Sequence, residues 1–288
     1  MSNKDLLDNI KKLRELTGVG FKDCKIALDE TSGDIEKSIE YLRKKGIAKA
    51  SKKMSRTASE GLVLVKEEKG EISLIEINSE TDFVAKNNDF INFCKELSNL
   101  NFKNKGDLEK LNNSKMDNGS LVKDNLVNLI SKIGEKITIR RGCFFDKNQG
   151  ENFYYVHSSL EKNIGKIISI VKLTGLSKEK TDSLGTKIAM HIAASNPLAI
   201  DKNDIDKDIV EKELEIIKAE IINSGKPKEL AEKISKGKIS KFLDDNSLLN
   251  QIWIMDPKKK VSDILKENSH EKEIKITKFV KYKVGEGI

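Results

Sequence analysis

Apolar residues stand at helical spacing before Gly61 and in strand-like runs after it. Leu6, Ile10 and Leu13 recur at i, i+4 and i+7, which places them on one face of a helix. After Gly61, two apolar runs flank a turn at 67–70, which is the pattern of a β-hairpin. We therefore predict an α+β protein whose first part is a bundle of three short helices.

Glycines divide the N-terminal segment into its helices. The loop at 17–20 ends the first helix, and Gly33 ends the second. Asp34 is then placed to cap the third helix, which Gly46 is expected to close. The basic stretch at 43–56 has few large apolar residues, so we predict a linker with some helical character.

A longer helix is predicted directly after the β-hairpin, from about Asp82 to Leu100. Ser79, with Asp82 three residues later, fits a capping box at its start. Phe83 lies seven residues before Phe90, which returns almost to the same helical face. The periodicity alone therefore predicts that Phe83 is a core residue.

A second α+β unit follows a helix that Gly134 is expected to stop. Strands are predicted at 153–156 and 167–173, and another helix comes after them. This strand, turn, strand, helix order resembles the first unit and leaves a diverged internal duplication open. Residues 205–243 predict an antiparallel helical hairpin with apolar stripes, and 274–284 predict a last strand.

The composition indicates a chain outside the membrane and without metal chemistry. Charged residues make up 34% and apolar residues 37%, and no apolar run is long enough to span a bilayer. The N-terminus has no apolar signal core, so we expect a cytoplasmic protein. Cys24, Cys94 and Cys143 form no CxxC pair and are expected to be reduced thiols. Three scattered histidines offer no metal-ligand spacing, and no metal is expected.

No motif for catalysis or nucleotide binding is visible. Gly18 and Gly20 lack the third glycine and the preceding strand of a dinucleotide-binding loop. Gly225 and Lys226 are followed by Pro227 where a phosphate-binding loop needs Ser or Thr. We therefore expect neither an enzyme nor a cofactor.

The net charge of +7 suggests a nucleic-acid-binding module as an alternative function. Residues 1–56 hold 14 Lys and Arg against 9 Asp and Glu, a balance of +5, and the remaining chain holds 39 against 37. Basicity is therefore concentrated in the first 56 residues. Aromatic residues make up only 5% of the chain, few for base stacking, so we do not expect direct nucleic-acid binding.

Seven short strings, in order along nearly the whole chain, resemble the elongation factor Ts family. Each string alone is weak, but the ordered set is hard to obtain by chance. The strings are Leu13–Gly20, Gly33–Glu36, Thr81–Ala85, Ile133–Glu135, Met190–Ala194, Ser224–Pro227 and Val284–Ile288.

The resemblance implies a division of the chain into five parts. It implies a ubiquitin-associated-like three-helix domain at the N-terminus, two core subdomains with antiparallel sheets, and a helical hairpin inserted into the second. The parts are the N-terminal domain with its basic linker at 1–55, the core N-subdomain at 56–142, the core C-subdomain at 143–204 and 244–279, the hairpin at 205–243, and a C-terminal segment at 280–288.

The resemblance also implies the function. Members of the family bind the GTPase elongation factor Tu, disturb its Mg²⁺ and phosphate site, and promote GDP release during translation elongation. A protein can release a ligand in this way only by binding the empty state better than the loaded one. The sequence leaves open whether the complex is one-to-one or a dimer of heterodimers.

The resemblance nominates particular contact residues. Asp82 and Phe83 are the pair that intrudes between helices of the GTPase, and on this reading Phe83 faces outward. The other implied contact positions are Thr81, Val84, Ile164, Gly165 and His191 in the core, and Leu13 and Val19 in the N-terminal bundle. On helical spacing alone, a lone histidine such as His191 is usually a core residue. The family commonly has an apolar residue after the glycine, and this chain has Lys166 there. The partner contacts implied for Ile164 and Gly165 are therefore the ones that match the family least.

Overall fold

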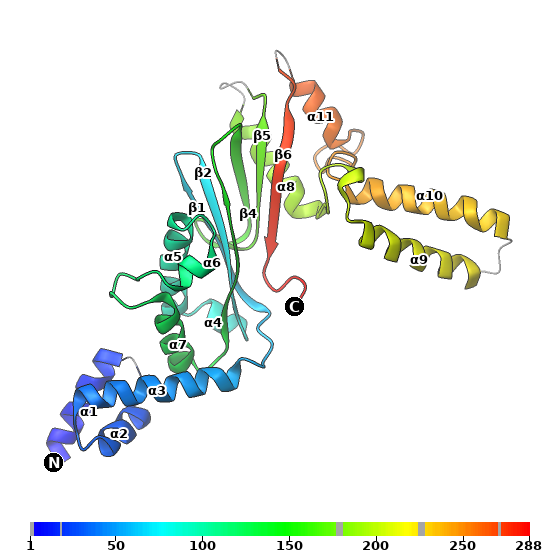
Figure 1. Cartoon of the computed structure of the whole chain (residues 1–288). Helices are drawn as coiled ribbons and strands as arrows, with labels where there is room; N and C mark the ends of the chain where they lie inside the picture. The colour runs from blue at the N-terminus through cyan, green and yellow to red at the C-terminus, as the bar shows by residue number, and fades with distance from the viewer. Residues whose placement is uncertain (1–2, 18, 177–180, 224–227, 270–271) are drawn as a thin grey trace.

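The computed structural model describes residues 3–17, 19–176, 181–223, 228–269 and 272–288. It is an α+β protein, as predicted (Figure 1). The helices are α1 (Asn3–Thr17), α2 (Phe21–Glu30), α3 (Ile35–Lys53), α4 (Asp82–Ala85), α5 (Asn88–Lys103), α6 (Leu108–Asn112), α7 (Val122–Ile133), α8 (Thr181–Ser195), the 3-10 helix η1 (Lys202–Asp204), α9 (Lys207–Asn223), α10 (Lys228–Asn246) and α11 (Val261–Asn268). The strands are β1 (Glu60–Glu68), β2 (Glu71–Ser79), β3 (Ile137–Phe145), β4 (Glu151–Glu161), β5 (Ile164–Thr174) and β6 (Lys275–Lys283).

The first three helices form a small bundle at one end of the molecule (Figure 1). Its core contains Ile10 and Leu13 from α1 together with Leu28 from α2. Gly33 has a φ of +84°, which favours glycine, and it turns the chain between α2 and α3. The Asp34 carboxylate accepts the Lys37 N–H at 3.0 Å, so the predicted cap is confirmed.

Helix α3 does not end at Gly46, and the predicted closure there is wrong. The helix continues to Lys53 and crosses α7. A Cβ at Gly46 would meet the Ser131 side chain at 3.5 Å, so Gly46 marks the close approach of the two helices. The Arg43 guanidinium adds an ion pair of 3.0 Å to Asp124 on α7. Most of the expected linker is therefore a helix that joins the bundle to the core.

One antiparallel sheet of six strands forms the centre of the molecule. The strand order is β3-β2-β1-β5-β4, and β6 also pairs with β5. The β1–β5 contact consists of Val63 opposite Gly165 and Leu64 opposite Ile164. Strand β6 pairs with the remainder of β5, from Ile167 onward. The predicted division between residues 142 and 143 falls inside β3, whose pairing with β2 is continuous across it.

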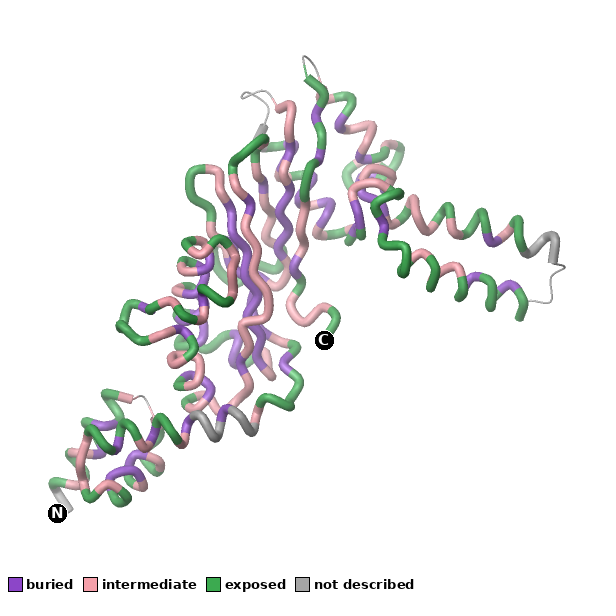
Figure 2. The backbone as a smooth tube through the Cα atoms, viewed as in Figure 1, coloured by how far each residue is buried: buried purple, intermediate pink, exposed green. Residues whose placement is uncertain are grey.

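The central strands consist largely of buried residues, as Figure 2 shows, and their side chains join apolar clusters on both faces of the sheet. In β1, Leu62 and Leu64 face α5 and α7, whereas Val63 and Val65 join a second apolar cluster with β5 and β6. A third cluster lies between the sheet and the helices α8 and α11, and it includes the completely buried Ile188 of α8. Burial on both faces explains why the apolar run in β1 is uninterrupted.

The predicted helical hairpin is present and consists of α9 and α10, which project away from the sheet (Figure 1). Ile217 and Ile221 of the predicted stripe are buried. The predicted turn at 224–227, with its glycine and proline, lies outside the described residues. Strand β6 confirms the prediction of a final strand.

The described part of the chain contains no helix long and apolar enough to cross a membrane. Across the same residues, no group of three or more metal-ligating side chains is assembled. The three cysteines are free, as predicted, and burial raises the pKa of the Cys94 thiol well above its ordinary value.

Candidate functional site

The helix predicted from Asp82 to Leu100 is interrupted, and the prediction of a continuous helix is wrong. Helix α4 ends at Ala85, and Asn87 adopts an extended conformation with φ −76° and ψ 132°. The Asn87 side-chain oxygen accepts the N–H groups of Asp89 at 2.9 Å and Phe90 at 3.3 Å. Asn87 is therefore the N-cap of a new helix, α5.

The interruption places Phe83 outside the core. Its side chain is 79% exposed, whereas Phe90 is completely buried. The helical phase that placed Phe83 in the core is therefore wrong, because the residues between them are not continuously helical. Val84, its neighbour, is buried against the core. The sequence signal for the break is the run Asn87–Asp89, whose polar residues favour helix caps over helix interiors.

The start of α4 is held by a carboxylate and not by the predicted capping box. Ser79 is the last residue of β2, and its hydroxyl donates to the Thr81 carbonyl at 2.9 Å. Thr81 is the N-cap of α4, without a side-chain cap hydrogen bond. The Thr81 N–H and hydroxyl donate to the two oxygens of Glu135, at 3.0 and 2.9 Å. Sequence reasoning assigned Glu135 no role.

Asp82 lies beside Phe83 with its carboxylate about half exposed. Lys86, one turn further along, lies 2.9 Å from it. The hydrogen bond from Lys86 and the positive charge of its ammonium lower the pKa of Asp82 from its ordinary value. The site therefore carries an ionised carboxylate next to an exposed aromatic ring.

A hollow of about 380 Å³ lies between α4, the start of β1 and the adjoining ends of β4 and β5. It brings Asp82 and Gly165, two of the predicted contact residues, to one surface. A Cβ at Gly165 would lie 2.7 Å from the Val156 side chain, so this position has room only for glycine. Ile164 is buried, and Lys166 pairs with a carboxylate at 2.7 Å. The lining residues are Glu60, Leu62, Asp82, Ala85, Lys86, Ser158, Ser159, Leu160, Gly165 and Lys166.

His191 is completely buried on α8 and has a hydrogen-bond partner at each ring nitrogen. Its Nε2 lies 3.0 Å from the Gln251 side-chain oxygen, and its Nδ1 accepts the Ile254 N–H at 3.4 Å. The Gln251 NH₂ group donates to two backbone carbonyls, which fixes that oxygen as the acceptor. These partners select the neutral ring with its proton on Nε2, and burial lowers the pKa of His191.

The loop held by His191 presents apolar side chains to solvent. Trp253 stacks on the His191 ring at a centroid distance of 5.1 Å and is itself buried. Ile254 and Met255, the next two residues, are 42% and 43% exposed. Sequence reasoning missed them; the available signal was an apolar run, 252–255, without helical or strand periodicity. In the free chain His191 therefore supports an exposed surface and is not part of one.

The N-terminal bundle separates its two predicted contact residues. Leu13 is completely buried in the bundle core, so in the free chain it holds the helices together. Val19 is partly exposed and packs against that core. Leu16 and Phe21, on either side of the loop, are 60% and 47% exposed. Gly18 lies outside the described residues.

The basic stretch directs several of its charges to partners within the chain. Arg43 pairs with Asp124, Lys44 lies 2.8 Å from an acid on its own helix, and Arg56 lies 3.2 Å from Glu80. These ion pairs reduce the positive charge that this segment offers to a polyanion. They give no support to the alternative nucleic-acid function.

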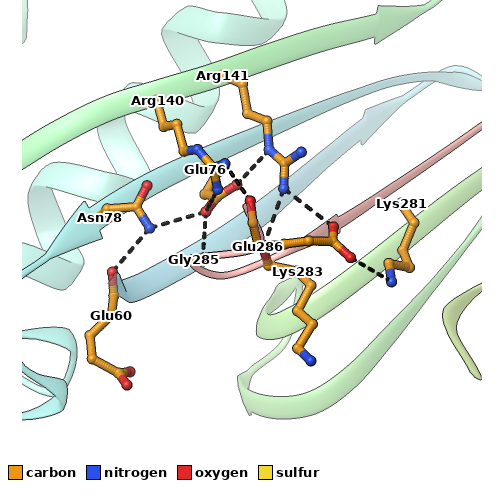
Figure 3. Close-up of polar contacts among 9 residues, drawn as sticks. All are labelled: Glu60, Glu76, Asn78, Arg140, Arg141, Lys281, Lys283, Gly285 and Glu286. Carbon is orange, nitrogen blue, oxygen red and sulfur yellow. Dashed lines mark hydrogen bonds and ion pairs between the residues drawn. The ribbon is translucent and has the colours of Figure 1, made fainter. Parts of the chain in front are cut away.

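A buried charge cluster attaches the C-terminal segment to the sheet (Figure 3). The Glu76 carboxylate on β2 is completely buried. It lies 3.0 Å from Arg140 and 2.6 Å from Arg141, and it accepts the N–H of Gly285 at 2.9 Å. Glu286 lies 3.0 Å from Lys281 and 3.8 Å from Arg141. Burial alone would raise the pKa of Glu76, but the hydrogen bonds from Gly285, Asn78 and Arg141 together lower it.

Comparisons with known proteins agree on one family. Residues 80–286 match the family model described as "Elongation factor TS". The chain is 41% identical to "Elongation factor Ts" of Rickettsia felis and of Rickettsia prowazekii, in each case over 97% of this chain and 91% of the relative. It is 42% identical to the protein of the same name from Methylobacterium sp. strain 4-46, over 97% of this chain and 92% of the relative.

Proposed function

Because the chain belongs to the elongation factor Ts family and is a translation elongation factor, we propose that it binds elongation factor Tu and accelerates GDP release. The observation that carries this proposal is Phe83. A large aromatic side chain that is 79% exposed, at the start of a short helix beside the sheet, is available for insertion into a partner. Nucleotide exchange is then driven by the binding energy of these contacts, and no covalent bond is made or broken.

The mechanism follows from what holds the nucleotide in such a GTPase. Loop amides, a lysine and a bridging Mg²⁺ bind the phosphates of the nucleotide. Phe83 enters the partner next to this region, and Asp82 brings a negative charge toward the Mg²⁺ and phosphates. The altered GTPase keeps its contacts with Phe83 only while the nucleotide site stays disturbed. Asp82 and Phe83, which we call the wedge, therefore bind the empty state better than the loaded one. This preference is the thermodynamic requirement for exchange.

The size of the effect requires more than one contact. Moving a two-state equilibrium from 1:99 to 99:1 takes about 5.5 kcal/mol of differential binding. Burying one phenylalanine contributes about 1.5–3 kcal/mol. The remainder has to come from other surfaces, and the exposed pair Ile254 and Met255 supported by His191 is one. The exposed apolar residues Leu16 and Phe21 of the N-terminal bundle are another.

The proposal is tested by release of a fluorescent GDP analogue from purified elongation factor Tu. The wild-type chain should accelerate release, and the variant Asp82→Ala/Phe83→Ala should lose most of this acceleration. A titration should also show weaker binding to the GDP·Mg²⁺ form of the partner than to the empty form. Equal affinity for both forms would contradict the mechanism, and full acceleration by the double variant would contradict the residue assignment.

A further inference from the structure

We infer that Glu135 and Glu80 are positioning residues that fix the direction in which Phe83 points, an inference that rests on the proposed function. Neither side chain carries a predicted contact with the partner. Both belong to a set of reciprocal hydrogen bonds between the segment before α4 and the segment before β3. We call the four residues Glu80, Thr81, Glu135 and Lys136 the carboxylate clasp.

The clasp joins two loops through carboxylates that each loop supplies to the other. Glu135 accepts the Thr81 N–H at 3.0 Å and the Thr81 hydroxyl at 2.9 Å. In return, Glu80 accepts the Lys136 N–H at 2.5 Å. The clasp lies just beyond the ladder between β2 and β3, in which Ser79 is paired with Ile137. Hydrogen bonds to ionised acceptors are stronger than neutral ones, so this arrangement limits the movement of both loops.

The clasp matters because α4 cannot orient Phe83 by itself. A helix of four residues is far too short to be stable alone. Most of the Phe83 ring is in solvent, so core packing constrains it little. Its direction therefore depends on how the backbone of α4 is held at its two ends, by the buried Val84 and Ala85 on one side and by Thr81 on the other. A side chain that is ordered before binding loses less conformational entropy on insertion, which favours the complex.

The end of α3 extends the clasp toward the N-terminal bundle. The Lys136 ammonium donates to the carbonyls of Met54 at 2.7 Å and Arg56 at 2.8 Å. Arg56 in turn holds Glu80, at 3.3 and 3.2 Å from its two oxygens. The segment that presents Phe83 is thus connected to the helix that carries the bundle.

The test is a double-mutant cycle on the rate of GDP release from elongation factor Tu. Glu135→Ala should lower the acceleration about tenfold, because a wedge that is poorly oriented seldom enters its site. In a Phe83→Ala background, the same substitution should change the rate less than about twofold, because no ring remains to be oriented. Urea unfolding of each variant establishes that the chain is folded under the assay conditions.

Two further variants keep the inference testable if Glu135→Ala folds poorly. Thr81 is itself an implied contact position, so Thr81→Val, which removes the hydroxyl donor but keeps the side-chain shape, is measured with and without the Phe83 ring. It should lower the acceleration about threefold in the wild-type background and have little effect in the Phe83→Ala background. Glu135→Gln keeps an acceptor for Thr81 and should recover part of the activity. The matched control is Glu67→Ala, whose carboxylate accepts the Gly70 N–H at 2.9 Å at the opposite end of the hairpin. This control should leave exchange unchanged.

The outcomes separate the inference from the proposed function. If Phe83→Ala lowers exchange but Glu135→Ala has the same effect with and without the Phe83 ring, the positioning role is wrong while the wedge stands. If Phe83→Ala leaves exchange unchanged, the wedge itself is wrong and the positioning role fails with it. A loss that disappears in the Phe83→Ala background supports both.

Discussion

The two halves of the core share one order of elements but use the helix after the hairpin in different ways. In the first half, the helix after β2 stops at Ala85 and restarts at Asn88, and Phe83 is exposed. In the second half, α8 continues from Thr181 to Ser195, and His191 is buried within it. A break in the helix exposes a ring, whereas an unbroken helix buries one.

This difference separates two of the predicted contact residues that the sequence resemblance treats alike. Phe83 is exposed and can contact a partner directly, and its ring contributes little to packing within the chain. His191 is part of the fold and can act on a partner only through the surface that it supports, including Ile254 and Met255. Substitutions at the two positions should therefore divide between stability and exchange in opposite ways.

The largest expected effect is on the stability of the second half. His191→Ala should lower the free energy of unfolding by about 3 kcal/mol, because it leaves a cavity beside Trp253 and unpaired groups on Gln251 and Ile254. Urea unfolding measures this loss. The control is His157→Ala on β4, an exposed histidine whose removal should change stability by less than about 0.5 kcal/mol. If both histidine variants lowered the free energy of unfolding by the same small amount, the structural role of His191 in the second half would be wrong.

The next effect is on exchange in the first half. Phe83→Ala should slow the GDP release that this chain stimulates in elongation factor Tu about 30-fold. This corresponds to the loss of about 2 kcal/mol that defines a binding hot spot. Its free energy of unfolding should stay within about 0.5 kcal/mol of the wild type, because the ring is mostly in solvent. Leu198→Ala removes another exposed apolar side chain and should affect neither quantity. A Phe83→Ala protein that is destabilised but fully active would reverse the assignment.

A smaller effect should come from the cap that interrupts the first helix. Asn87→Ala should lower the free energy of unfolding by about 1 kcal/mol, because the N–H groups of Asp89 and Phe90 lose their acceptor. It should also slow GDP release, since the break sets the direction of α4. Asp107→Ala removes the matching cap of α6, where the carboxylate accepts the Lys110 N–H at 3.0 Å. That variant should show a similar stability loss with unchanged exchange.

The smallest effect concerns pH. The pKa of His191 is lowered from 6.5 by burial, so below pH 6.5 the unfolded chain takes up a proton that the folded chain resists. The folded state therefore loses stability as pH falls below 6.5, down to the folded-state pKa. Urea unfolding between about pH 7.5 and about pH 5.5 should show a steeper decline for wild type than for His191→Gln. Parallel curves would mean that the ring is not held neutral.

Long periodic elements were predictable from the sequence. The three N-terminal helices, the hairpin of β1 and β2, the helix ended by Gly134, the α9–α10 pair and the final strand all follow from spacing and turn residues. Each is specified locally, by residues close together in the chain. The same is true of the Asp34 cap.

Features that depend on distant contacts were not predictable. Gly46 normally indicates a helix end, but packing against α7 lets α3 continue through it. The phase of Phe83 was misleading because Asn87 forms a local cap that competes with helix continuation. The role of Glu135 depends on a residue 54 positions earlier, at Thr81, which no periodicity reveals. The exposure of the site was therefore a prediction from resemblance, and its support came from the structure.

The hydrogen bond between Glu76 and Gly285 has a consequence for biosynthesis. The two residues are 209 positions apart, and at ribosomal speeds that interval corresponds to roughly 10–40 s. Strands β1 to β3 emerge long before the donor that completes the Glu76 carboxylate. Strand β1 can pair with β5 once residues 164–165 have emerged, but the Glu76 carboxylate stays without its Gly285 donor until the last strand has been synthesised.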